Sequence, residues 1–187
     1  MKSLRTLALL PLAAAAAQAY TIEFQLGKNH PDGFAEGSVV GLNISGQVNK
    51  DISIGLNLTD KKLDDTDNWN NGVGVLSDNT SFTEPNVVKV RNASLDITYE
   101  LNHRGAIHPF VGVGIGYAWL SNTEGVTTSN TVMTTSFFGG IRFELSRDID
   151  IAFNVRNNQL LSLKNFDGST EKTYKNWEST VGLRFKF

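Results

Sequence analysis

The 187-residue chain contains no cysteine and only four prolines. It also lacks any apolar run of about 18 residues, so no transmembrane helix is expected. Without cysteine the chain has no disulfides and no thiol that could carry a lipid, which excludes a bacterial lipoprotein and a small disulfide-stabilised secreted protein. Its net charge of −2 leaves no basic surplus, so nucleic acid is not an expected partner.

The first 19 residues have the pattern of a secretory signal peptide. Lys2 and Arg5 form a positive start, residues 7–17 are apolar, and Ala17-Gln18-Ala19 is a small-x-small cleavage site. The apolar segment is too short to span a bilayer and is interrupted by Pro11. We therefore predict a signal peptide over 1–19 and a mature domain over 20–187.

After Tyr20 the hydropathy pattern has a period of two, which predicts strands. Between residues 38 and 49, for example, Val40, Leu42 and Ile44 alternate with Asn43 and Ser45. The same alternation recurs along the chain, and 17 glycines supply turns and close approaches. The predicted strands are 21–26, 38–49, 52–59, 87–101, 108–120, 132–146, 149–157 and 173–187.

The connections between these strands alternate in length. Those at 49–51, 102–107 and 146–148 are short, whereas those at 28–37, 60–86, 121–131 and 158–172 are long and polar. An even number of strands with short turns at one end and long loops at the other is typical of a membrane barrel. The pattern predicts an all-β fold: an eight-stranded antiparallel up-and-down transmembrane β-barrel, with short periplasmic turns and longer extracellular loops.

A soluble barrel would alternate in the same way, with its apolar face inside. The polar face here carries charges of both signs, which a narrow barrel can pair in its interior. It also carries Gly112, Gly114 and Gly116, which we expect to leave room for long interior side chains, with a bend of the barrel wall as the alternative. The predicted interior charge network is Glu23, Asp96, Glu100, Arg142, Glu144, Asp150, Arg156, Glu178, Arg184 and Lys186.

Aromatic residues on the apolar face fall near the ends of the predicted strands. Membrane barrels carry such girdles at both membrane interfaces, whereas a soluble core would collect its aromatics in the middle. This distribution favours the membrane barrel. The predicted interface aromatics are Tyr99, Tyr117, Trp119, Phe143 and Trp177.

The C-terminus places Val181, Leu183, Phe185 and Phe187 at alternate positions and ends on phenylalanine. This resembles the signal read by the outer-membrane barrel assembly machinery. With the glycine-rich strand 108–119, it is similar to the small eight-stranded outer-membrane barrels: the OmpA transmembrane domain, OmpX and the opacity-type, porin-family barrels. The resemblance implies a Gram-negative outer-membrane location. It also implies contact with outer-membrane lipid and lipopolysaccharide, passage through the assembly machinery, and a monomeric state.

Two enzymes share this scaffold by resemblance, the lipid A deacylase and the palmitoyltransferase. The deacylase has a His-x-Ser element, which none of His30, His103 and His108 forms here. His30 lies toward the long loops, where Asp32 and Ser38 are the available triad partners, but we expect it to be a solvated side chain. We therefore predict no enzyme and no cofactor.

Residues 64–72 are rich in Asp and Asn but depart from the EF-hand pattern. We expect an acidic solvated loop there, with weak calcium binding as the alternative. The predicted function is a structural or interaction barrel that supports the envelope and contacts a surface ligand through loops 60–86 and 158–172. The alternative is a narrow porin-like channel for small solutes or ions.

Overall fold

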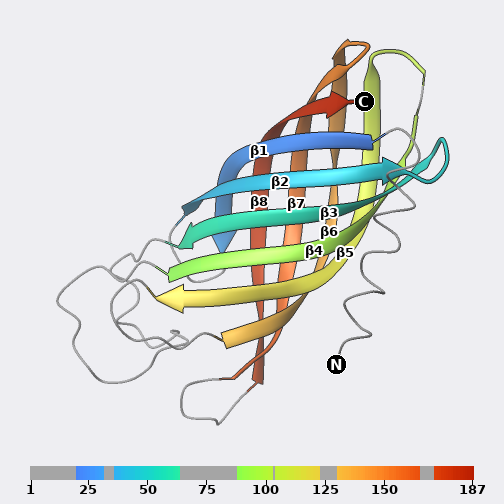
Figure 1. Cartoon of the computed structure of the whole chain (residues 1–187). Helices are drawn as coiled ribbons and strands as arrows, with labels where there is room; N and C mark the ends of the chain where they lie inside the picture. The colour runs from blue at the N-terminus through green and yellow to red at the C-terminus, as the bar shows by residue number, and fades with distance from the viewer. Residues whose placement is uncertain (1–19, 32–35, 64–87, 103, 123–129, 165–170) are drawn as a thin grey trace.

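The computed structural model describes residues 20–31, 36–63, 88–102, 104–122, 130–164 and 171–187. Each strand pairs antiparallel with the next, and β8 returns to pair with β1, so eight strands form a closed barrel (Figure 1). This confirms the predicted fold. The strands are β1 (Tyr20–Pro31), β2 (Gly37–Gln47), β3 (Ile52–Leu63), β4 (Val88–Glu100), β5 (Ile107–Asn122), β6 (Asn130–Ser146), β7 (Ile149–Lys164) and β8 (Glu171–Lys186).

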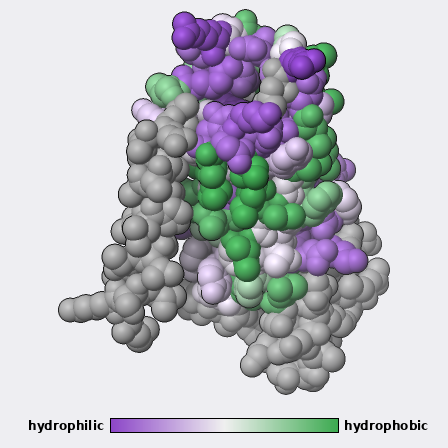
Figure 2. Space-filling view, turned by 90° about the vertical axis from the view of Figure 1, so that its right-hand side faces the viewer, coloured by the Kyte–Doolittle hydropathy of each residue, from purple (hydrophilic) through white to green (hydrophobic). Residues whose placement is uncertain are grey.

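The polar residues of each strand point into the barrel and the apolar residues point out. In β4, Asp96 is 2% exposed, whereas its neighbours Leu95 and Ile97 are 39% and 46% exposed. This is the reverse of a soluble protein, in which the apolar side chains would be buried. Figure 2 shows hydrophobic atoms gathered across the middle of one face, with hydrophilic residues above them. An apolar outer wall of this kind matches a lipid surrounding.

The short turns form because local side chains satisfy the backbone. The Asn49 side-chain oxygen accepts hydrogen bonds from the amides of Asp51 and Ile52, both at 2.8 Å. Gly105 adopts a positive φ of 84° in the turn between β4 and β5, a conformation that favours glycine. The Phe187 amide donates to the Tyr20 carbonyl at 3.0 Å, so both ends of the barrel domain lie together at the short-turn end.

The predicted strand limits were wrong at the long-loop end. Residues 28–31, 60–63, 121–122, 130–131, 158–164 and 171–172, all predicted as loop, belong to strands. Outward positions are polar at Lys28 and Asp60, whereas the apolar Leu160 of β7 is buried inside the barrel. The hydropathy contrast between the two faces therefore disappears although the strands continue.

No helix among the described residues is long and apolar enough to cross a membrane. The predicted signal peptide, residues 1–19, lies outside the described residues. The same is true of residues 64–72, where weak calcium binding was the alternative.

Candidate functional site

The barrel interior holds most of the charged residues that the sequence analysis singled out. Glu23, Asp96, Arg142, Asp150, Arg156 and Glu178 are buried. Glu100, Arg184, Lys186 and Glu144 lie at the short-turn end and are more exposed. These residues come from β1, β4, β6, β7 and β8, and the alternation along each strand turns them all toward the axis.

The middle of the interior is closed by Arg156. Its guanidinium forms an ion pair with Asp96 and donates from Nη1 to the Ser136 hydroxyl at 3.0 Å. It also stacks over the Phe138 ring, with Cζ 4.1 Å from the ring centroid. Since Arg156 lies on β7 and Asp96 on β4, this contact crosses the interior between strands that are not neighbours. A planar cation with a carboxylate at its edge and a ring on its face is a well-satisfied buried group.

Arg142 repeats this arrangement nearer the short-turn end. Its Nη1 lies 3.0 Å from Glu100 Oε2, and its Cζ lies 4.1 Å above the centroid of Phe110. The sequence analysis identified the two arginines but not the two phenylalanines. Both rings lie on the polar face of their strands, and that position was the available signal for an interior role.

At the long-loop end, Lys61 crosses the barrel to form an ion pair with Glu178. Asn158 and Asn176 also donate to the same carboxylate oxygen. Lys61 was missed because it fell in the predicted loop 60–86. It keeps the inward parity of Asn57 and Thr59, which was the signal for its position.

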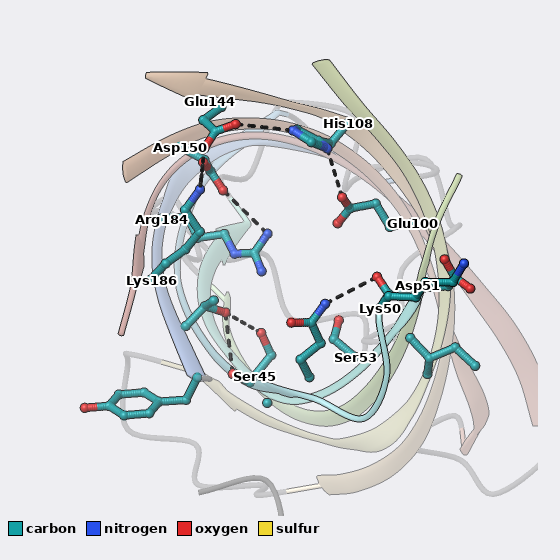
Figure 3. Close-up of a pocket in the computed structure, with 15 residues that line it drawn as sticks. Ser45, Lys50, Asp51, Ser53, Glu100, His108, Glu144, Asp150, Arg184 and Lys186 are labelled. Carbon is teal, nitrogen blue, oxygen red and sulfur yellow. Dashed lines mark hydrogen bonds and ion pairs between the residues drawn. The ribbon is translucent and has the colours of Figure 1, made fainter. Parts of the chain in front are cut away.

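The short-turn end of the interior opens into a pocket of about 210 Å³ (Figure 3). Lys186 Nζ lies 2.8 Å from Asp150 and 3.3 Å from Glu144. His108, which was not assigned to the network, places Nδ1 3.0 Å from Glu100 and Nε2 3.7 Å from Glu144. The cavity below this pocket, lined in part by both arginines, is only about 20 Å³.

Two predicted members of the network have different contacts from the rest. Glu23 accepts a hydrogen bond from Gln25 Nε2 at 2.8 Å, and within the described residues it forms no ion pair. Arg184 contacts Asp150 only at 3.7 Å, and its guanidinium extends toward the centre of the lumen (Figure 3).

The glycines of β5 make room for this network. A Cβ on Gly112 would overlap the Phe138 ring, and one on Gly114 would overlap the Asp96 carboxylate and the Ser136 hydroxyl. Both glycines therefore sit beneath groups that position Arg156. Gly116 differs, since its Cβ would meet the backbone of Ala93 and Ser94.

The predicted interface aromatics all point outward. Tyr117, Trp119 and Trp177 lie toward the long-loop end, whereas Tyr99 and Phe143 lie toward the short turns. The C-terminal residues Val181, Leu183 and Phe187 also face outward, and Phe187 stacks on Tyr20 with centroids 5.0 Å apart. Phe185 packs edge-on against Phe24 at 6.4 Å.

The residues considered for catalysis or metal binding are placed as follows. His30 lies on the outer wall, with Nδ1 2.9 Å from Glu36 Oε1. Ser38 pairs across the strands with Lys28, whereas Asp32 and His103 lie outside the described residues. Within the described part of the chain, no three His, Asp or Glu side chains are grouped so that they could hold a metal ion.

Solved structures similar to this chain are small barrels of bacterial outer membranes. Neisserial surface protein A has 15% identity and a TM-score of 0.64, covering 90% of this chain and 96% of its own. The N-terminal barrel domain of Pseudomonas aeruginosa OprF has 13% identity and a TM-score of 0.55, covering 89% and 97%. At these identities the likeness shows the fold alone.

Comparison with curated protein sequences finds no match. The model of the outer membrane protein beta-barrel domain family, however, matches residues 3–187. This match covers all the described strands, and it agrees with the inverted wall and the charged interior. The chain belongs to the outer membrane protein beta-barrel domain family.

Proposed function

We propose that this protein is a closed, non-conducting barrel that supports the envelope and makes surface contacts at its long-loop end. The observation that carries the proposal is the filled interior. Arg142 and Arg156, each stacked on a phenylalanine, leave a cavity of about 20 Å³ between the strands. A space of that size holds about one water molecule.

The proposal includes the orientation and biogenesis that the sequence implies. Short turns lie in the periplasm and the long loops outside, as in other barrels of this kind. Export by residues 1–19 in a Gram-negative cell, and recognition of the outward C-terminal residues by the assembly machinery, belong to the same proposal. The barrel is proposed to act as a monomer.

Surface contact is proposed for the segments that join β3 to β4 and β7 to β8. Within the strand part of the predicted loops, Lys61, Asn158 and Leu160 do not take part, because they are buried inside the barrel. A partner approaching from outside therefore meets the connecting segments and the outer rim.

We also propose that the barrel is not an enzyme. His30 contacts Glu36, and among the described residues no hydroxyl group lies within hydrogen-bonding distance of its ring. An acyl-transfer triad needs a nucleophile next to the histidine. Mass spectrometry of lipid A from cells with and without the protein tests this point, and a lipid A species lacking an acyl chain only in expressing cells would contradict it.

A narrow channel remains the second candidate because the pocket at the short-turn end already has a volume of about 210 Å³. Conduction would require Arg142 and Arg156 to leave their partners. Their ion pairs and ring contacts oppose this movement.

The refolded barrel is expected to give no reproducible single-channel steps in a planar bilayer, because the arginine layers occlude the lumen. A general porin reconstituted in parallel serves as the positive control. Steps of constant size that scale with the amount of protein would support the channel and overturn the proposal.

A further inference from the structure

The pocket at the short-turn end contains an arginine that lacks the partners of the other two interior arginines. Arg142 and Arg156 each stack on a phenylalanine and each face a carboxylate at hydrogen-bonding distance. Among the described residues, Arg184 has no such ring and no hydrogen bond, and it approaches Asp150 only to 3.7 Å. Its cross-strand neighbour Glu23 does not pair with it either. The Arg184 side chain is nonetheless only 13% exposed, so most of its five N–H donors are enclosed without a protein acceptor.

The acidic side chains around this arginine are held by other cations. Lys186 Nζ lies 2.8 Å from Asp150 Oδ1 and 3.3 Å from Glu144 Oε1. Arg142 Nη1 lies 3.0 Å from Glu100 Oε2. Each of the three carboxylates therefore has a closer cation than the arginine at the centre of the pocket. The positive charge of that arginine is left without an anion at contact distance.

The other side of the pocket presents hydroxyl groups from β1, β2 and β3. Figure 3 shows the Arg184 guanidinium between the acidic side chains on one side and Ser45 and Ser53 on the other. The Ser45 hydroxyl lies 2.7 Å from the Thr21 hydroxyl. A hydroxyl group can both donate and accept hydrogen bonds. The pocket therefore places a cation beside a wall that can bind neutral polar groups.

The pocket is large enough for a small organic ion. Its volume of about 210 Å³ equals that of about seven water molecules. The cavity beyond it, next to Arg142, is only about 20 Å³. A molecule that fills the pocket therefore enters and leaves at the short turns. A concave space with a few converging polar groups is the usual form of a small-molecule site.

The charges around the pocket define the class of ligand. A guanidinium binds a planar carboxylate through two parallel N–H···O hydrogen bonds. A second negative charge on the ligand would be repelled by Asp150, Glu144 and Glu100. The rest of the ligand meets hydroxyl groups, which favours a hydroxylated chain over an apolar one.

We propose that this pocket binds a small hydroxylated monocarboxylate, the chemistry of a sugar acid. Arg184 holds the carboxylate, and the hydroxyl groups of Ser45 and Ser53 bind those of the ligand. The inference goes beyond the proposed function and does not depend on whether the lumen conducts. With the short turns in the periplasm, as proposed above, the ligand is a periplasmic one.

The test is a titration of sodium gluconate into the refolded, isotope-labelled barrel in micelles of an uncharged detergent, at constant ionic strength. Backbone amide shifts in the nuclear magnetic resonance spectrum report the binding. We expect saturable shifts near the pocket, with one gluconate per barrel. Sorbitol has the hydroxyl groups but no carboxylate, and glucarate has a second carboxylate. Both should bind at least about tenfold more weakly, since a hydrogen bond to a charged group contributes at least about that factor.

Three variants locate the site. Arg184→Gln removes the charge and should weaken gluconate binding about 10- to 100-fold. Ser53→Ala removes a hydroxyl from the other side of the pocket and should weaken it about fivefold. Arg147→Gln is the matched control, because Arg147 is an exposed arginine of the turn between β6 and β7 and does not line the pocket. This variant should bind gluconate as the unmodified barrel does.

Several results would overturn the proposal: shifts that do not saturate, sorbitol or glucarate binding as tightly as gluconate, or unchanged binding by folded Arg184→Gln. An equal loss in Arg147→Gln would also contradict it, because it would indicate a general effect of surface charge. The shift in gel mobility on heating reports whether each variant has folded. The comparison of the three ligands uses the unmodified barrel, so it decides the proposal even if a variant does not fold. Conductance is measured separately, and an open lumen would therefore be distinguished from a failure to bind.

Discussion

Replacing Arg156 by methionine is expected to lower the free energy of unfolding by about 3–5 kcal/mol, because the change leaves a buried carboxylate without its cation. Among the residues that the structure describes, Asp96 would keep only the hydrogen bond from the Ser94 hydroxyl at 2.9 Å. The Phe138 ring would lose the guanidinium that covers it. Urea titration of the barrel in lipid vesicles, followed by tryptophan fluorescence, measures the change.

The double variant D96L/R156M removes both members of the buried ion pair and is compared with Arg156→Met. Replacing both members of a buried pair by apolar residues is often neutral or stabilising, so most of the lost stability should return. Arg91→Gln breaks an exposed pair with Asp60 and is the matched control, with an expected cost of about 0–1 kcal/mol. Equal decreases in the free energy of unfolding for Arg156→Met and Arg91→Gln would show that the buried ion pair contributes no more to stability than the exposed one.

Gly116→Ala is expected to destabilise the barrel by about 1–3 kcal/mol or more, through overpacking of the wall itself. The added Cβ would overlap the Ala93 carbonyl oxygen and lie 2.6 Å from Ser94 Cα. These are backbone atoms of the paired strand β4, so no side-chain rotation relieves the clash. The urea midpoint and the fraction of heat-modifiable protein after refolding report the effect.

Gly139→Ala is the control for this steric argument. Gly139 lies on β6, and its added Cβ would come no closer than 3.2 Å to the Phe110 oxygen. Neither glycine has a positive φ, so alanine adds no torsional strain at either site. If the Gly116→Ala barrel is as stable as the Gly139→Ala barrel, then β4 and β5 accommodate the added methyl group without loss of stability, which contradicts the steric argument.

The sequence was sufficient to predict the strand number, the pairing order and the inward face of the ten charged residues assigned to the network, but not that of Lys61. The face of a residue follows from its odd or even position along the strand, because a residue such as Asp96 cannot change face unless its whole strand shifts by one residue. The partners were not predictable in the same way. Lys61 and Glu178 are separated by 117 positions and meet only because the barrel closes.

The missed features share one physical cause. Hydropathy distinguishes the two faces only where apolar and polar residues alternate, so the ends of β3 and β7, where this alternation is lost, were predicted as loops. Phe110 and Phe138 were missed because an aromatic residue on a polar face has no visible role until an arginine from another strand lies above it. The sequence therefore predicted the apolar outer wall and the charged interior, but not the stacking of the two arginines on the two phenylalanines.

The pairing of β1 with β8 has a consequence for the time course of folding. It joins Thr21 to Lys186 and Pro31 to Asn176, the most distant segments of the described chain. Contacts this far apart form slowly, and until they form both strands expose unpaired backbone edges that invite aggregation. Closure is therefore the step at which the nascent barrel is most vulnerable. A helper that shields those two edges until they meet would protect the unclosed barrel from aggregation.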